Sequence, residues 1–446
     1  MPVARYHADW AWLPPPTDPT ADAGPAKGVL IDVDQGRITA VVPNSPRPND
    51  AQRLAGLTLP GLANAHSHAF HRALRGRTQG GRGTFWTWRE RMYAVAANLD
   101  PDRYHALARA AYAEMALAGI TCVGEFHYLH HAPDGRRYAD PNAMGEALLA
   151  AAAEAGIRIT LLDTCYLTST VDGRPLAGTQ LRFGDGDAAR WADRAGALKP
   201  DAHARIGAAI HSVRAVPVDQ MSTVVDWAAG RDAPLHVHLS EQRAENEACL
   251  AHLRRTPTEV LADAGALGPR TTCVHATHLT DSDRTELGDT DTAVCFCPTT
   301  ERDLADGIGP ARPLVDAGSP LCLGSDSHAV VDLFEEARAV ELNERLRTER
   351  RGQFAPADLV RAASRAGHES LGWPDAGAIA VGAWADLVTV RLDTVRTAGC
   401  DPAAIVFAAT AADVAHVVVD GRVVVRDGVH CGLSNVAAAL REAIGA

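Results

Sequence analysis

The stretch Pro60-Gly61-Leu62-Ala63-Asn64-Ala65-His66-Ser67-His68 decides the fold of this chain. An apolar run from Leu57 to Leu62 predicts a buried strand, and His-Ser-His follows it directly. Residues i and i+2 of an extended chain project to the same side, so His66 and His68 can direct both imidazoles at one point beyond the strand end. Neutral imidazole is a common ligand of zinc and iron. The pair therefore predicts half of a metal site, and two surface histidines on a loop are the alternative.

The length and composition describe a soluble globular protein with a large core. A chain of 446 residues suits a (β/α)8 barrel with a small appendage. A content of 46% hydrophobic and 22% charged residues is typical of a folded globular protein. The net charge of −12 argues against a nucleic-acid partner or an anionic membrane surface. No stretch approaches the ~20 apolar residues that span a bilayer, so we expect no membrane association.

The chain also lacks the signs of secretion. Residues 1–16 contain no basic segment followed by an apolar one, so no signal peptide is expected. The nine cysteines are scattered and odd in number, which favours reduced thiols. We therefore predict a cytoplasmic protein.

Outward from the histidine pair, short apolar runs alternate with alanine-rich helical stretches. Eight runs predict strands: 57–63, 121–126, 158–163, 204–210, 234–238, 271–274, 292–296 and 320–324. Helix-like segments between them include 101–118, 142–155, 217–229 and 257–264. Eight strand–helix units predict an α/β chain with a parallel (β/α)8 TIM-like barrel over residues 57–371.

The two ends of the chain predict a second, smaller domain. Residues 29–33 and 37–42 alternate around a turn and predict a hairpin, and residues 14–16 and 18–24 predict a loop. After about Gly372 we expect no further helices, while residues 385–390, 417–419 and 422–425 predict strands. We therefore expect residues 1–56 and 372–446 to form one small β-sandwich domain.

Polar residues at the predicted strand ends identify the active site, because barrel enzymes carry their chemistry there. Besides the first pair, strand ends carry His211, His236 with His238, His275, and Asp326. Histidine or aspartate at four particular ends is difficult to obtain by chance. His236 and His238 lie two positions apart, so both can face one side, and position alone leaves open which of them is a ligand.

These motifs resemble the amidohydrolase superfamily, and within it the formimidoylglutamate deiminase family. The wider resemblance rests on His-x-His, a histidine at strands five and six and an aspartate at strand eight. The narrower one rests on residues 65–70, 85–90, 125–131, 211–216 and 306–308. One position departs from the family pattern, since His71 stands where a glutamine near the substrate is expected.

The resemblance implies a metal site made of His66, His68, His238 and Asp326, with His236 left to packing. Two-metal barrels of this kind usually bridge their ions with a carbamylated lysine, but this chain has only Lys27 and Lys199, and neither ends a strand. We therefore expect one zinc ion per chain, with iron as the alternative. Weaker candidates, expected to support the ligands or to lie in loops, are His127, His130, His131, His278 and His328.

The mechanism expected from this site is hydrolysis. Asp326 would hold the metal and take a proton from water, Glu241 would act as general acid and base, and His275 would stabilise the attacking oxygen. The resemblance implies the substrate N-formimino-L-glutamate, which would become N-formyl-L-glutamate and ammonia in histidine degradation.

A small dicarboxylate substrate needs fixed cations, and arginine's planar fork suits a carboxylate. Arg89 and Arg214 are the candidates, helped by Tyr128, His211 and His71. Two other readings stay open: a superfamily deaminase that acts on a purine or related ring, and a catalytically inactive structural barrel. We also expect a homodimer.

Overall fold

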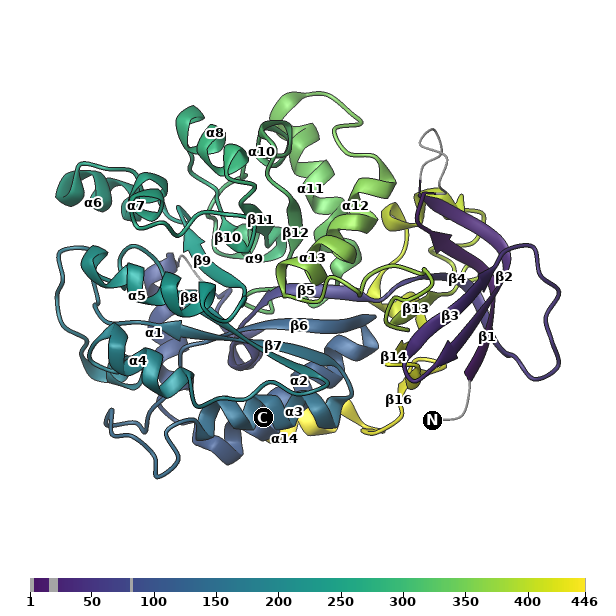
Figure 1. Ribbon diagram of the computed structural model, residues 1–446, viewed down its shortest axis with the longest axis horizontal. Helices are drawn as coiled ribbons and strands as arrows, with labels where there is room; N and C mark the ends of the chain where they lie inside the picture. The colour runs from purple at the N-terminus through teal and green to yellow at the C-terminus, as the bar shows by residue number, and fades with distance from the viewer. Residues whose placement is uncertain (1–3, 16–22, 81–82, 446) are drawn as a thin grey trace.

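The computed structural model describes residues 4–15, 23–80 and 83–445, which form two sheets of eight strands each. One sheet is the barrel at the left of Figure 1, and the other lies against its end at the right. Of the predicted loop at 14–16 and 18–24, residues 16–22 lie outside the described part. The predicted (β/α)8 barrel with a small β domain from both chain ends is confirmed.

The barrel strands are parallel and follow one another in chain order. They are β5 (Leu62–Ser67), β6 (Ile120–His127), β7 (Arg158–Cys165), β8 (Ala204–Ile210), β9 (Leu235–Leu239), β10 (Thr271–His275), β11 (Ala293–Phe296) and β12 (Leu321–Leu323). Just beyond β12, Asp326 closes the ring onto β5 by two backbone hydrogen bonds, from its N–H to the His66 carbonyl at 3.0 Å and from the His68 N–H to its carbonyl at 3.3 Å, and side chains add to the closure. The Asn64 amide donates to Ser325 Oγ at 2.7 Å and accepts from the Ser325 backbone N–H at 2.8 Å.

The run 57–63 is not one strand, so that prediction is wrong. Its first part belongs to β4 (Gln52–Pro60) in the other sheet, and its second part belongs to β5. The chain passes between the sheets at Gly61, where a Cβ would lie 2.3 Å from Thr121 Oγ1. Both strands are buried on both faces there, so the sequence shows one uninterrupted apolar run.

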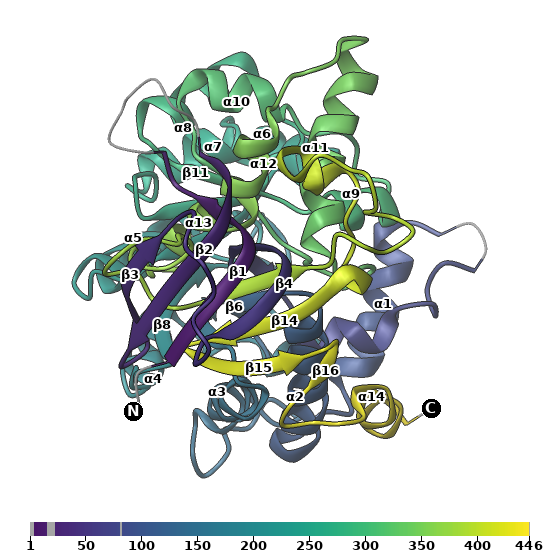
Figure 2. The ribbon, with the colours of Figure 1, turned by 90° about the vertical axis from the view of Figure 1, so that its right-hand side faces the viewer.

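The second sheet is mixed and draws on both chain ends. Its strands are β1 (Ala4–Leu13), β2 (Gly24–Asp34), β3 (Arg37–Val42), β4, β13 (Leu387–Val390), β14 (Val414–Val419), β15 (Arg422–Arg426) and β16 (Val429–His430). β4 joins the two halves, because it pairs with β1 in parallel and with β13 antiparallel. Figure 2 shows these purple and yellow strands side by side. The domain limits at 56/57 and 371/372 stay a prediction.

Helices surround the barrel. They are α1 (Phe85–Ala96), α2 (Pro101–Leu117), α3 (Ala143–Ala155), α4 (Ala188–Ala195), α5 (Val218–Ala229), α6 (Arg243–Leu253), α7 (Pro257–Asp263), α8 (Asp281–Asp289), α9 (Pro298–Asp303), α10 (Ala311–Ala317), α11 (Leu333–Thr348), α12 (Pro356–Ala363), α13 (Arg365–Ser370) and α14 (Val436–Ile444). The expectation that helices stop after Gly372 is wrong, because α14 begins after an Asn435 side chain that accepts from the Ala438 N–H.

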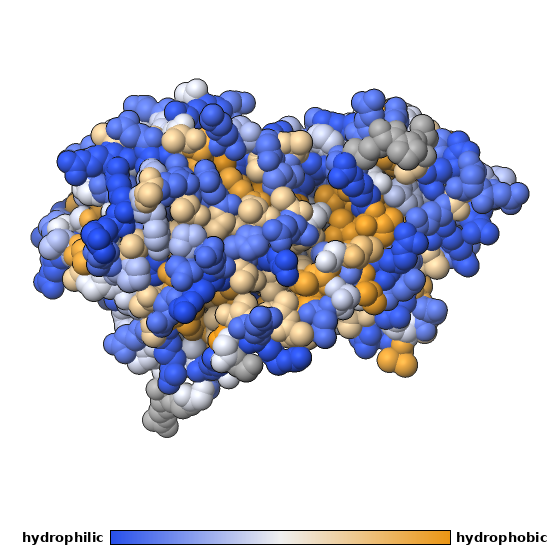
Figure 3. Space-filling view, turned by 90° about the horizontal axis from the view of Figure 1, so that it is seen from below, coloured by the Kyte–Doolittle hydropathy of each residue, from blue (hydrophilic) through white to orange (hydrophobic). Residues whose placement is uncertain are grey.

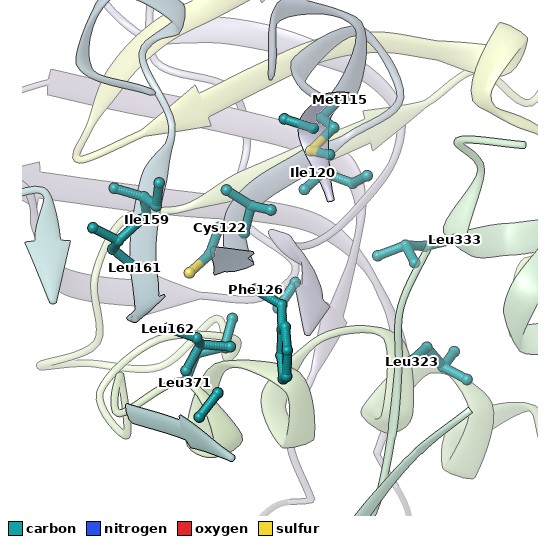
Figure 4. Close-up of a cluster of buried hydrophobic side chains, with 14 of the residues drawn as sticks. Met115, Ile120, Cys122, Phe126, Ile159, Leu161, Leu162, Leu323, Leu333 and Leu371 are labelled. Atoms are coloured by element: carbon teal, nitrogen blue, oxygen red, sulfur yellow. The ribbon is translucent and has the colours of Figure 1, made fainter. Parts of the chain in front are cut away.

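The barrel core follows the alternation of its strands. On β6, Phe126 points into the barrel against the His66, His68 and His238 rings, whereas Leu161 of β7 packs outward on α3. Figure 4 shows Leu371, which lies beyond α13, beside Leu162 of β7. Apolar side chains thus contribute to the barrel core beneath the histidine rings.

The face seen from below is hydrophilic around its margin, and hydrophobic residues, drawn in orange, gather toward its middle (Figure 3). Among the helices of the described residues, none is both long and apolar enough to cross a bilayer.

Candidate active site

The side chains predicted for the site converge on one cavity at the carboxyl ends of the barrel strands. Its free volume is about 50 Å³. His66 lies buried behind the cavity wall, and the other predicted residues line it: His68, His71, Arg89, Tyr128, His211, Arg214, His238, Glu241, His275 and Asp326. The sequence positions therefore meet in space as the strand order requires.

Four of these side chains form a group that could hold a metal ion. One ligand atom each from His66, His68, His238 and Asp326 lies within 4.8 Å of the others. Asp326 Oδ1 lies 3.3 Å from Nε2 of both His66 and His68, and His238 Nε2 lies 3.1 Å from His66 Nε2. All four residues are buried.

The ring tautomers suit a metal. His68 Nδ1 lies 2.9 Å from the Phe126 carbonyl, and His238 Nδ1 lies 2.9 Å from the His211 carbonyl. A carbonyl can only accept, so both Nδ1 atoms carry the proton and both Nε2 atoms present lone pairs. Burial lowers the pKa of His66, His68 and His238 well below 6.5, which keeps these rings neutral. The donor set of three neutral imidazoles and one carboxylate fits zinc or iron.

The backbone is strained at or just beyond the carboxyl ends of three barrel strands. Ser240, His275, Ala276, Asp326 and His328 all have φ between +40° and +70°. Residues other than glycine adopt this region at a cost of about 1–3 kcal/mol each, and such strain concentrates at functional sites. Surrounding bonds hold it, since the Asp326 N–H donates to the His66 carbonyl at 3.0 Å and the Ala276 N–H donates to Leu239 at 3.0 Å.

His275 is surrounded by carboxylates. Its Nδ1 lies 3.4 Å from Glu301 Oε1, and its Nε2 lies 3.7 Å from Asp326 Oδ2 and 3.9 Å from Glu241 Oε1. Burial opposes protonation, but Glu241, Glu301 and Asp326 outweigh it and raise the pKa of His275 to about 10. A cationic His275 donates from both ring nitrogens, so Nε2–H faces the cavity.

Glu241 lies beside His275, but its surroundings favour the uncharged form of the side chain. Burial raises its pKa to about 7, with Asp326 adding to the rise and His275 opposing it. A carboxyl group that titrates near neutral pH is suited to general acid–base catalysis. Glu301, which supports His275, was not among the predicted residues, since it lies in α9 beyond the seventh barrel strand rather than at a strand end.

One face of α1 forms a wall of the cavity. Phe85, Trp88, Arg89, Met92 and Tyr93 line it, with the three- and four-residue spacing of a single helix face. The Arg89 guanidinium lies over the Trp86 ring at 4.3 Å. The cationic group therefore rests on an aromatic ring beside the cavity.

Arg214, which follows β8, also lines the cavity and has defined partners. Its Nη1 donates to Tyr166 Oη at 2.9 Å, and its Nε lies 3.5 Å from Glu245 Oε2. Tyr166 directly follows β7, so the strand-end rule that found the other residues could have found it. Glu245 lies in α6, well past the end of β9, and has no such signal.

The remaining predicted contact residues lie next to one another on the cavity wall. His71 Nε2 and Tyr128 Oη are 3.1 Å apart, and burial lowers the pKa of His71 to about 4. His211 stacks edge-on against Tyr166 with ring centroids 4.3 Å apart. A neutral His71 can donate or accept, so it offers a hydrogen bond but no charge.

A second buried group, His127, His130 and Asp163, is close enough to bind a metal, but most of its polar atoms have protein partners. His130 Nε2 lies 2.9 Å from the Thr164 carbonyl, and its Nδ1 lies 3.3 Å from His127 Nε2. Asp163 pairs with Arg194 at 2.8 Å, and only Nδ1 of His127 has no partner among the described residues. Because Arg194 neutralises the carboxylate and His130 is bonded at both nitrogens, this group is a structural network. His236 is also structural, with Nε2 3.0 Å from the Ser370 carbonyl.

Comparison with known proteins agrees with this geometry. The family model described as "Amidohydrolase family" matches residues 57–424. The chain belongs to the amidohydrolase family. It is 36% identical over 439 residues to a formimidoylglutamate deiminase of Pseudomonas aeruginosa, covering 95% of this chain and 96% of that one. It is 30% identical to an 8-oxoguanine deaminase of the same species, over 93% of each chain.

Solved structures support the same assignment. The crystal structure of an amidohydrolase from Brucella melitensis superposes with a TM-score of 0.90 at 32% identity, over 99% of both chains. The fold alone is shared with an adenosine deaminase from Xanthomonas campestris with bound zinc, at a TM-score of 0.83 and 23% identity. This amidohydrolase is a hydrolase acting on C–N bonds, from a metal-dependent family with a matching donor set.

Proposed function

We propose that this amidohydrolase converts N-formimino-L-glutamate and water to N-formyl-L-glutamate and ammonia, with one zinc or iron ion per chain. The observation that carries the proposal is that Arg89 and Arg214 line the same cavity as the His3Asp group. An amidine with two carboxylates needs a hydrolytic centre and two fixed cations within one molecule's length. The 36% identity to the Pseudomonas aeruginosa deiminase supports the same substrate.

In this proposal His66, His68, His238 and Asp326 hold the ion. The ion would supply a Lewis acid that lowers the pKa of water from ~15.7 toward ~7. The imidazoles are neutral before they bind it, so no protons from them must be displaced.

The chain's own residues would then manage protons and charge. Water adds its oxygen to the formimino carbon while Asp326 accepts a proton from it. Glu241, with a pKa of about 7, delivers a proton to the terminal nitrogen as its double bond to that carbon becomes single. Glu241 then takes the proton of the added hydroxyl, so that the oxygen becomes the formyl carbonyl. The proton held by Asp326 passes to the same nitrogen as the C–N bond breaks, which releases ammonia and restores both carboxyl groups. His275 donates Nε2–H to the oxygen that becomes the formyl carbonyl, which stabilises the charge that develops there.

Substrate binding would be shared between the two arginines of the cavity. Arg89 on α1 and Arg214 beyond β8 would each pair with one carboxylate, and Tyr128, His211 and His71 would add hydrogen bonds. Arginine forms two parallel hydrogen bonds with a carboxylate, which fixes the orientation of the chain between them.

A purine-type deaminase is the second candidate, because the cavity wall is aromatic and a relative acts as an 8-oxoguanine deaminase. The deciding experiment measures ammonia release from N-formimino-L-glutamate and from 8-oxoguanine by purified protein whose metal content is determined on the same sample. Turnover of the amidine with about one zinc or iron per chain is expected. Turnover of the purine alone, or two tightly held ions per chain, contradicts the proposal. The homodimer and the cytoplasmic location stay predictions.

A further inference from the structure

Arg214, which follows β8, lies beside two cavities, and its side chain could occupy either of them. Beside the active-site cavity lies an outer cavity of about 510 Å³, bounded by α1, by residues 170–174 and by α6. Arg214 and Glu245 line both cavities, whereas Tyr166 lines only the inner one. The outer cavity is large enough for an arginine side chain, so something must keep Arg214 facing inward.

The protein contacts of the Arg214 guanidinium engage some of its N–H donors and leave others available. Nε faces Glu245 Oε2 at 3.5 Å and one N–H of Nη1 goes to Tyr166 Oη at 2.9 Å. Within the described part of the chain, Nη2 has no hydrogen-bonded protein partner. Arginine carries five N–H donors, so three remain: one on Nη1 and two on Nη2. These are the two terminal nitrogens, which together match the two oxygens of a carboxylate.

Glu245 is well placed to impose this orientation. It lies in the first turn of α6, and its side chain and that of Arg214 are each 14% exposed. A carboxylate beside Nε fixes the plane of the guanidinium, because the Nε–H bond lies in that plane, on a different edge from the one between the two terminal nitrogens. Tyr166 alone leaves the group free to turn about a single hydrogen bond.

We infer that Glu245 is a positioning residue that holds the Arg214 guanidinium inside the active-site cavity, with both terminal nitrogens turned toward a substrate carboxylate. This inference rests on the proposed function. Glu245 does not contact the reacting atoms in this assignment, so its effect should fall on substrate binding rather than on the chemical step.

The test compares Glu245→Leu and Glu245→Gln with wild type in steady-state kinetics on N-formimino-L-glutamate. Glu245→Leu should raise KM by about 10-fold or more and change kcat by less than about 3-fold. Glu245→Gln should recover most of the loss, because its amide oxygen can take the place of the carboxylate oxygen beside Nε. Metal content and Tm are measured on each variant, and Glu247→Leu, an exposed position on the same helix, is the matched control.

Two monocarboxylate analogues add a readout that general damage would not produce. One lacks the α-carboxylate and the other lacks the side-chain carboxylate of N-formimino-L-glutamate. The analogue that lacks the group bound by Arg214 should have the same KM with wild type and with Glu245→Leu, and the other should show the full rise.

The outcomes distinguish a failure of the inference about Glu245 from a failure of the proposed function. If wild type is active and Glu245→Leu leaves KM unchanged, or lowers kcat with every substrate alike, the inference is wrong and the proposed function stands. If wild type releases no ammonia from N-formimino-L-glutamate, the proposed function is wrong and the inference falls with it.

Discussion

At the scale of single residues, neighbours decide the chemistry of otherwise ordinary side chains. His275 and His238 are both buried strand-end histidines, yet carboxylates raise the pKa of one to about 10 while burial lowers that of the other well below 6.5. The first suits charge stabilisation, and the second suits a metal. The sequence could place both at strand ends, but Glu301, which supports His275, lies outside that pattern.

Glu241→Gln should separate proton transfer from metal binding. The variant keeps its volume but cannot carry a proton, so kcat should fall by at least ~10²-fold, the usual size of an acid–base contribution. Metal content should not change, because Glu241 is outside the ligand group. Elemental analysis and ammonia release on one preparation check both. A near-normal kcat would remove Glu241 from the mechanism.

Arg89→Met and Arg214→Met should each weaken recognition of the dicarboxylate. Leaving a substrate carboxylate poorly paired in a buried site typically costs ~2–5 kcal/mol. At ~1.4 kcal/mol per factor of ten, kcat/KM for N-formimino-L-glutamate should fall by ~30-fold or more. An amidine without carboxylates serves as the control substrate and should lose much less. Equal losses on both substrates would reject the two-arginine clamp.

At the scale of elements, the sequence predicted the barrel strands but not the point where the chain passes from one sheet to the other. Parallel strands buried on both faces are continuous apolar runs, which is why β8 matched its predicted range. The same property hid the passage from β4 to β5 at Gly61, since the apolar run continues through it. Likewise, α14 is a short alanine-rich helix, and the strand pattern before it gave no sign of it.

Asn64→Ala should loosen the closure between β5 and β12. It removes two buried hydrogen bonds and leaves the Ser325 N–H unpaired, and each unsatisfied group costs about 1–3 kcal/mol. The free energy of unfolding in urea should therefore fall by about 2–5 kcal/mol. Metal affinity should fall as well, because the joined strand ends carry His66 and Asp326.

The control for this variant is Asn98→Ala, whose amide donates to the Ala94 carbonyl at an exposed position. That change should alter stability by less than about 0.5 kcal/mol, as surface substitutions usually do. If the two variants unfold alike, side-chain closure of the barrel contributes nothing measurable.

At the scale of the whole molecule, buried neutral histidines make stability depend on pH. Burial lowers the pKa of His127 and of His368 to about 4, against 6.5 in the unfolded chain. Between these values the unfolded chain binds more protons, so stability is fully present above pH 6.5 and is lost as pH falls toward 4. Each group can contribute about 3 kcal/mol by the rule of 1.36 kcal/mol per pKa unit.

His368→Gln should therefore reduce the pH dependence of unfolding. His368 lies at the far end of the barrel from the metal group, with Nδ1 3.0 Å from the Ser364 carbonyl. Urea unfolding of wild type and variant at pH 7, 6 and 5 isolates its contribution, because protonation of the metal ligands is common to both. The difference in free energy between the proteins should shrink as pH falls. A constant difference would contradict the burial argument.

The sheet shared by the two chain ends has a consequence for synthesis on the ribosome. Thr58 of β4 and Thr389 of β13 hydrogen-bond at 3.0 Å although they are 331 positions apart. The first four strands can pair with one another as they emerge, but the edge of β4 that β13 covers stays open while the whole barrel is being translated. An open edge strand is prone to pairing with other chains. Nascent chains released before β13 should therefore be targets for chaperones or for aggregation, and only chains carried through β13 can cover that edge.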